Sequence, residues 1–272
     1  MTLTTLRRFN VTQNIAAWRG GNGPSMVLIH GVGLNADAWY AMLPELLEKY
    51  TVTVIDLPGH GDSAAIANVA EPSLNAFTSV ISDALVECDG PSVVIGHSMG
   101  ALIAMDLACN AGVNICGAVA LNAIFRRSDT AQQAVKARAK ELCDAGVVDN
   151  AATLKRWFGE NPQGSLQIAS DHCEKMMKVT HIAGYAPAYT VFSECDGPTD
   201  AELKNCKVPM LFMTGAEEPN STPAMSRALA ALAPNSEYIT VEGARHMMPC
   251  THASQVNHHI EQFLRSREIF NE

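Results

Sequence analysis

The residue pattern with the clearest chemical meaning is a serine held between two glycines. Residues 93–108 read VVIGHSMGALIAMDLA, so an apolar run leads into Gly96, Ser98 and Gly100 and then directly into a helix-period segment. A G-x-S-x-G turn between a strand and a helix exposes the serine hydroxyl, and its glycines allow the two elements to approach closely. We therefore predict that Ser98 is a nucleophile at the carboxyl end of a strand.

A serine hydroxyl is a weak nucleophile and needs a neighbouring base. Of the nine histidines, His246 in EGARHMMP follows the last strand-like run, which would place it at the same sheet edge as Ser98. The local pattern around His246 is equally typical of a solvated loop histidine. His97 precedes the serine directly, and we expect its side chain to face away from the cleft.

Cleavage of an acyl bond also requires N–H donors for the oxyanion that forms. The stretch LIHGVGLN (28–35) ends a strand-like run in an HGVG turn, whose glycines can direct backbone amides into the cleft. We predict the N–H groups of Val32 and Met99 as the two donors. The turn matches neither G-x-G-x-x-G nor a P-loop with its lysine, which argues against nucleotide binding. We expect neither a cofactor nor a metal ion.

Apolar periodicity predicts the scaffold that must position these residues. Short runs rich in Val and Ile alternate with helix-period segments, which is typical of βαβ units and a mostly parallel sheet covered on both faces. The runs are MVLIHG (26–31), TVTVIDLPG (51–59), PSVVIGHS (91–98), GAVALNA (117–123), VPMLFMTG (208–215) and EYITVEGARH (237–246). The first 20 residues instead indicate an antiparallel hairpin at the sheet edge, interrupted at Asn10 and Asn14.

One long interval contains no strand-like run. Residues 126–205 carry successive helix-period patterns, and a segment of this length is too long for a loop. We predict a core domain of residues 1–125 and 206–272, with residues 126–205 inserted as a helical cap between strands 6 and 7.

Composition limits the function classes further. The net charge is −9 over 272 residues, whereas nucleic-acid-binding proteins carry basic surfaces. The chain shows neither a secretory signal nor an apolar run long enough to span a membrane. The eight cysteines form no CxxC pair, which favours reduced thiols. We expect a cytoplasmic protein that acts on a small molecule and binds neither nucleic acid nor membrane.

In order along the chain, HGVG, DLPGHGDS, GHSMG, a helical insertion, TGAEEP and GARHMMP resemble the alpha/beta-hydrolase family with a cap domain. The resemblance covers essentially the whole chain. It implies an α/β fold with a mostly parallel, eight-stranded sheet flanked by helices. It also implies the triad order nucleophile, acid, histidine, which Ser98, an acid near 218 and His246 satisfy. DLPGHGDS would be a structural turn, with no catalytic role for His60 or Asp62.

The same resemblance implies which residue is the acid. The family usually has G-x-x-D after this strand, and the fourth position from Gly215 is Glu218. Glu217 would then be a solvated loop residue. Some members place the acid after the preceding strand, where this chain has Asn122, and an amide cannot supply the charge.

The serine nucleophile argues against the epoxide hydrolases and haloalkane dehalogenases of the family, which use an aspartate. The resemblance therefore implies a hydrolase of a small-molecule ester or lactone, similar to the esterases and 3-oxoadipate enol-lactonases. Hydrolysis of a carbon–carbon, amide or thioester bond remains open. So does a receptor of this fold that binds a ligand with little turnover.

Substrate selection would depend on the helical insertion. Arg126 and Arg127 follow a strand that ends at the active edge, and either could pair with a substrate carboxylate or simply begin the cap in solvent. Trp157 could line the substrate pocket or belong to the interior of the cap.

Overall fold

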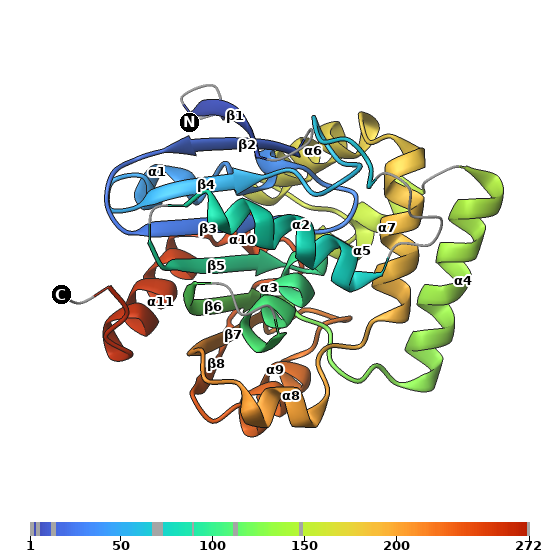
Figure 1. Cartoon of the computed structure of the whole chain (residues 1–272). Helices are drawn as coiled ribbons and strands as arrows, with labels where there is room; N and C mark the ends of the chain where they lie inside the picture. The colour runs from blue at the N-terminus through green and yellow to red at the C-terminus, as the bar shows by residue number, and fades with distance from the viewer. Residues whose placement is uncertain are drawn as a thin grey trace.

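Runs of Val, Ile, Leu and Met form one central eight-stranded sheet in the computed structural model (Figure 1). The structure describes residues 3, 6–11, 15–66, 73–88, 90–110, 114–146 and 149–270. The strands are β1 (Arg7–Val11), β2 (Ile15–Gly20), β3 (Ser25–Ile29), β4 (Thr51–Ile55), β5 (Ser92–His97), β6 (Ile115–Leu121), β7 (Met210–Gly215) and β8 (Ser236–Val241). Their spatial order is β1-β2-β4-β3-β5-β6-β7-β8, and the pairs from β4 to β8 are parallel. The predicted fold class is confirmed.

An antiparallel hairpin forms the β1 edge of this sheet, as the sequence predicts. The predicted interruption at Asn10 is wrong, because Asn10 lies inside β1 and pairs with Ala16 of β2. The second predicted interruption, Asn14, lies outside the described residues.

Helices cover both faces of the sheet because successive strand residues point to opposite sides. In β3, Met26 and Leu28 pack into one layer, while Val27 and Ile29 pack into the other. The first layer contains η2 (Ala36–Trp39), α1 (Leu43–Leu46), α10 (Met248–Thr251) and α11 (Ala253–Ser266). The second contains α2 (Leu74–Val86), α3 (Met99–Asn110), α8 (Asp200–Asn205) and α9 (Pro223–Leu232). Burial on both faces explains why the strands read as continuous apolar runs.

The insertion between β6 and β7 is helical. It contains α4 (Asp129–Ala145), α5 (Asn150–Phe158), α6 (Ser165–Lys178) and α7 (Ile182–Glu194). In Figure 1, α4 and α7 run side by side beyond the sheet edge toward which β4 and β5 point. We call α4 to α7 the cap.

The predicted insertion range of 126–205 is too long at its C-terminal end. Helix α8 falls inside that range, yet Leu203 on α8 is fully buried with Leu102 of α3 and Leu229 of α9. This helix therefore belongs to the layer that covers the sheet, because its apolar side chain is buried there and not in the cap.

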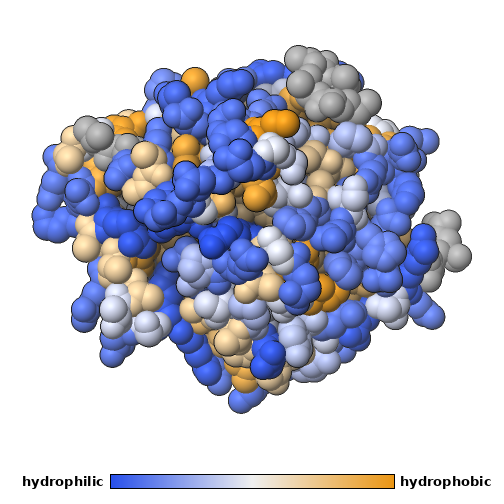
Figure 2. All heavy atoms as spheres, turned by 180° about the vertical axis from the view of Figure 1, so that it is seen from behind, coloured by the Kyte–Doolittle hydropathy of each residue, from blue (hydrophilic) through white to orange (hydrophobic). Residues whose placement is uncertain are grey.

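One face of the molecule is mainly polar. Figure 2 shows a face on which hydrophilic residues predominate and hydrophobic ones are scattered. Within the described ranges, no helix has both the length and the apolar character needed to cross a bilayer. All eight cysteines, at positions 88, 109, 116, 143, 173, 195, 206 and 250, are free thiols.

Candidate active site

Ser98 lies in a strained turn between β5 and α3. Its φ is 56°, in the left-handed region that residues other than glycine rarely adopt. A Cβ at Gly96 would lie 1.9 Å from the carbonyl oxygen of Gly100, and one at Gly100 would lie 2.1 Å from that of Ile29. Both contacts are impossible, so the glycines of the motif are required for the helix to start this close to the sheet.

Glu218 and His246 are brought together by the loops that follow β7 and β8. The Nδ1 of His246 lies 2.7 Å from Oε2 of Glu218. A Cβ at Gly215 would lie 2.1 Å from the carbonyl oxygen of Ala244, so this glycine is what lets the two loops approach. The Oε1 of Glu218 accepts a hydrogen bond from the N–H of Asn220 at 2.8 Å.

The charge of Glu218 is stabilised although the carboxylate is buried. Burial by itself would raise its pKa, but attraction to His246 and hydrogen bonds from that ring and from the backbone of Asn220 and Ser221 outweigh it. The pKa of Glu218 falls from 4.5 to about 2. An ionised acid next to Nδ1 holds the imidazole with Nε2 unprotonated, as a general base requires.

The two adjacent glutamates differ sharply in environment. The side chain of Glu217 is 58% exposed and that of Glu218 is fully buried. Glu217 lies 3.5 Å from Nε of Arg245, on the solvent side of the loop. This placement agrees with the expectation that Glu218, rather than Glu217, faces the histidine.

Asn122 contributes to the site in a way that the sequence analysis missed. Its Nδ2 donates to Oε2 of Glu218 at 3.1 Å, the same oxygen that contacts His246. Asn122 is fully buried at the end of β6 with φ 52°, a conformation that asparagine tolerates well. Sequence reasoning excluded it as the acid, but an amide unable to carry charge is well suited to donate a hydrogen bond to one.

The HGVG turn lies directly against Ser98. A Cβ at Gly31 would lie 3.0 Å from Cβ of Ser98. The N–H of Gly33 donates to Nε2 of His60 at 3.0 Å, so the DLPGHGDS turn holds the loop, in keeping with the structural role expected for it. In the described part of the chain, the N–H groups of Val32 and Met99 have no protein acceptor. Both amides therefore remain available to a ligand.

His97 does not face away from the cleft, so that expectation is wrong. Its ring lies 4.9 Å from that of His246, and its Nε2–H donates to the carbonyl oxygen of His246 at 2.8 Å. Burial lowers the pKa of His97 to about 3, so the ring is neutral and acts as a donor. His97 therefore lies against the loop that carries His246.

A cavity of about 350 Å³ separates these residues from the cap. Ser98, His246 and Val32 line its core side. The cap contributes Arg138 of α4, Arg156 and Trp157 of α5, and Tyr185 and Tyr189 of α7. Trp157 is therefore a cavity residue, and its indole also stacks on His246 with ring centroids 5.4 Å apart. The sequence could not identify Arg138 or Arg156 as cavity residues, because a helical pattern does not indicate which face of a cap helix is turned toward the site.

A second cavity of about 490 Å³ continues outward through the cap. Arg138, Arg156, Tyr185 and Tyr189 line both cavities. Arg138 donates to the Tyr189 hydroxyl at 3.3 Å and Arg156 to Thr153 Oγ1 at 2.8 Å. Among the residues that the structure describes, no carboxylate forms an ion pair with either arginine. Both guanidinium groups therefore retain unused donors beside the cavities.

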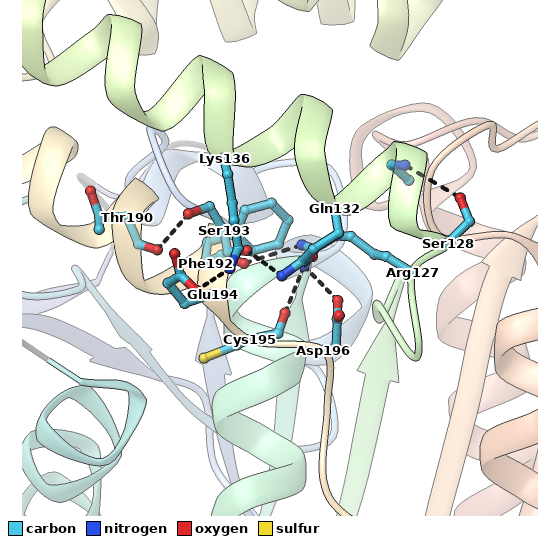
Figure 3. A network of polar contacts seen from close by, with 11 residues as sticks. Arg127, Ser128, Gln132, Lys136, Thr190, Phe192, Ser193, Glu194, Cys195 and Asp196 are labelled. Carbon is cyan, nitrogen blue, oxygen red and sulfur yellow. Dashed lines mark hydrogen bonds and ion pairs between the residues drawn. The ribbon is translucent and has the colours of Figure 1, made fainter.

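Arg126 and Arg127 have different positions. The side chain of Arg126 is 59% exposed, pairs with Asp200 and does not line the cavity, so its expected contact with substrate has no support in the geometry. Arg127 lines the cavity, but its side chain is 4% exposed and its donors are engaged. Figure 3 shows the guanidinium binding Asp196 and the carbonyl oxygens of Phe192 and Cys195, at 2.7 to 3.1 Å. Arg127 thus ties the start of the cap to the end of α7.

The chain matches the family model described as "Alpha/beta hydrolase family" over residues 26–258. It belongs to the alpha/beta hydrolase family. Curated relatives of this chain are themselves hydrolases and esterases, which supports hydrolase activity of the alpha/beta hydrolase type.

Two curated relatives span nearly the whole alpha/beta hydrolase chain. An (E)-2-((N-methylformamido)methylene)succinate hydrolase of Acinetobacter baylyi is 33% identical over 251 residues, which is 90% of this chain and 92% of the relative. A pimeloyl-[acyl-carrier protein] methyl ester esterase of Xanthomonas axonopodis is 26% identical over 257 residues, covering 90% and 97%.

Solved structures share the fold. A thermophilic esterase from Thermogutta terrifontis has a TM-score of 0.81 and 22% identity over 96% of this chain and 98% of its own. The enol-lactonase from Burkholderia xenovorans also has a TM-score of 0.81 and 22% identity, over 95% and 100%. At this identity the likeness concerns the fold alone.

Proposed function

We propose that this alpha/beta hydrolase is a serine hydrolase that cleaves an acyl bond through an acyl-enzyme intermediate. The observation that carries the proposal is that His246 lines one cavity with a strained, glycine-supported Ser98 while its Nδ1 lies 2.7 Å from the buried carboxylate of Glu218. A receptor that only bound a ligand would have no use for a nucleophile, a base and a buried ionised acid in one place.

In the first half of the reaction, His246 Nε2 takes the proton of Ser98 as Oγ attacks the acyl carbon. The resulting oxyanion accepts hydrogen bonds from the N–H groups of Val32 and Met99, which have no other acceptor in the described protein. Ionised Glu218 stabilises the imidazolium, which then protonates the leaving group. In the second half, His246 takes a proton from water as the water oxygen attacks the acyl carbon, and it returns that proton to Ser98 Oγ as the bond between Oγ and the acyl carbon breaks.

The substrate that fits this site best is small and carries a carboxylate. Arg138 and Arg156 border the cavity above Ser98 and have unused donors, and a guanidinium binds a carboxylate through two parallel hydrogen bonds. The relative at 33% identity is named for a succinate substrate, which supports an anionic substrate here as well. Glu141 and Asp149 line the outer cavity, so we place the carboxylate in the inner one.

The bond type has two candidates. Our first proposal is an ester or a lactone. A serine triad with an oxyanion hole is sufficient to hydrolyse the bond between an acyl carbon and an oxygen leaving group. Hydrolysis of an amide is the second, since the name of the Acinetobacter relative describes a substrate with an amide nitrogen. The same residues would serve both reactions, with His246 protonating an oxygen or a nitrogen leaving group.

The test compares a neutral and an anionic ester of one leaving group, p-nitrophenyl acetate and p-nitrophenyl hemisuccinate. It adds a small lactone and (E)-2-((N-methylformamido)methylene)succinate as substrates. Ser98→Ala should lose several orders of magnitude in kcat on every compound that the wild type hydrolyses. Hydrolysis that survives Ser98→Ala would refute the proposed nucleophile.

Substrate charge is tested with Arg138→Gln and Arg156→Gln. Each should lower kcat/KM for the hemisuccinate about tenfold to a hundredfold, the effect of removing a charge-assisted hydrogen bond, and barely change it for the acetate. Arg126→Gln is the matched control, since it removes an arginine outside the cavity. Equal losses on both esters would refute the carboxylate contact.

A further inference from the structure

A side chain of the cap lies flat on the imidazole of His246. The indole of Trp157 and the imidazole have centroids 5.4 Å apart and planes inclined by 24°. Trp157 comes from the last turn of α5, whereas His246 follows β8 in the core. The cap therefore contacts the group to which we assign the role of general base.

The packing around Trp157 fixes this contact. Phe158, the next residue, is 4% exposed and packs in one cluster with Leu34 and with Met247, the residue that follows His246. Trp157 itself packs against the same cluster. Because the end of α5 is anchored on the loop that carries His246, the indole has a defined position over the ring.

The stack acts on a different part of the ring from the other contacts. Glu218 contacts the Nδ1 atom of the ring, and the ring of His97 lies 4.9 Å away with its plane tilted by 55°. These are the titratable groups packed against His246 from the core, and Arg138 and Arg156 are the charged groups that the cap places around the shared cavity. Trp157 instead presents its π face, which attracts a cation within about 6 Å of the ring centroid.

We propose that Trp157 is a positioning residue that holds the imidazole of His246 and stabilises its protonated form during acyl transfer. The inference rests on the proposed function, because it assumes that His246 becomes an imidazolium in the reaction. This role differs from lining the pocket. The indole would act on His246, so it would affect the hydrolysis of every substrate. The cap thereby supplies part of the catalytic machinery of the core.

The kinetic test uses Trp157→Phe and Trp157→Leu with p-nitrophenyl acetate, a neutral substrate with a small acyl group. We expect the leucine variant to lose about three- to tenfold in kcat with little change in KM, and phenylalanine to retain an intermediate rate. The low-pH limb of the kcat/KM profile should move to lower pH by about 0.5 to 1 unit in the leucine variant. Trp18→Phe, on strand β2 and outside the cavity, is the control and should change neither quantity.

The outcome that would overturn the proposal is equally definite. A merely structural role would make leucine and phenylalanine equivalent and leave the pH limb unmoved, and a contact with substrate alone would change KM. Thermal unfolding of both variants shows whether each is folded. The phenylalanine variant keeps an aromatic face and so remains informative if leucine destabilises α5.

A second measurement needs no activity. A protonated imidazole in contact with an indole quenches its fluorescence, so the emission of Trp157, taken as wild type minus Trp157→Phe, should fall as His246 gains a proton. His246→Gln should abolish this dependence on pH. If the wild-type protein is inactive but its Trp157 emission still depends on pH, the contact between Trp157 and His246 stands and the proposed function is rejected. If the protein is active but the emission does not depend on pH, only the role of Trp157 is rejected.

Discussion

Replacing Glu218 by glutamine removes one charge and keeps the size of the side chain. The pKa of Glu218 falls from 4.5 to about 2, a preference for the charged form worth about 3 kcal/mol at roughly 1.4 kcal/mol per unit. Much of that preference comes from attraction to His246, which grows when the histidine takes the proton of Ser98. We expect Glu218→Gln to lower kcat by about a hundredfold to ten-thousandfold, with the larger figure applying if the amide also favours the wrong tautomer.

Glu217→Gln is the matched control for this experiment. It makes the same chemical change one residue earlier, on a side chain that is 58% exposed and turned toward Arg245. Its initial rates on p-nitrophenyl acetate should differ little from those of the wild type. A larger loss in Glu217→Gln than in Glu218→Gln would refute the assignment of the acid and the reading of the 2.7 Å contact behind it.

The same charge has a consequence for stability. Because folding depresses the pKa of Glu218, its ionisation stabilises the folded state above pH 4.5, and this contribution is lost as the pH falls toward about 2. Between pH 4.5 and about 2, the free energy of unfolding of the wild type should therefore fall by about 3 kcal/mol more than that of Glu218→Gln. Urea unfolding at a series of pH values measures this, and parallel curves for the two proteins would contradict it.

Three further perturbations test the structure around the site. Asn122→Asp sets a second carboxylate about 3.1 Å from that of Glu218, so the Tm near neutral pH should fall by about 3 to 8 °C. This loss of Tm should become smaller at lower pH, and scanning calorimetry at several pH values measures it. Gly100→Ala brings a methyl group to 2.1 Å from the carbonyl oxygen of Ile29, and circular dichroism should show no stable native fold. Arg127→Gln leaves the buried partners of the guanidinium unpaired and should lower the Tm by about 4 °C or more. Arg126→Gln, at an exposed side chain, is the control and should change the Tm by less than about 2 °C in the same thermal scan.

Local sequence carried much of the prediction of the fold and of the triad. The strands that lead to Ser98 and Glu218, β5 and β7, are buried along their whole length, so each reads as an apolar run followed by a turn. The glycines at 96 and 100 are visible in sequence because the backbone there admits no other residue. Order along the chain then supported the choice of acid and base, and the geometry places Glu218 against His246 in agreement with it.

Other features of the site arise from contacts between distant segments, which leave no periodic trace in sequence. His97 was expected to point away, yet it lies beneath the loop of His246, 149 positions further along the chain. Asn122 was set aside for lacking charge, although its role as donor depends on Glu218 being ionised nearby. Arg138 and Arg156 look like ordinary surface residues of amphipathic helices until the packing of the cap turns them toward the cavity.

Sequence by itself thus determined the scaffold and the strained turn at Ser98, because backbone sterics and burial act over a few neighbouring residues. Tertiary structure alone decided what surrounds the reacting atoms. The neighbours of Glu218 and the ring that covers His246 come from β6 and α5, and the orientation of the cap depends on packing summed over many side chains. Arg126 and Arg127 illustrate the difference: adjacent and identical in type, one faces solvent and the other is buried in the junction, because the chain turns between them as it leaves the sheet.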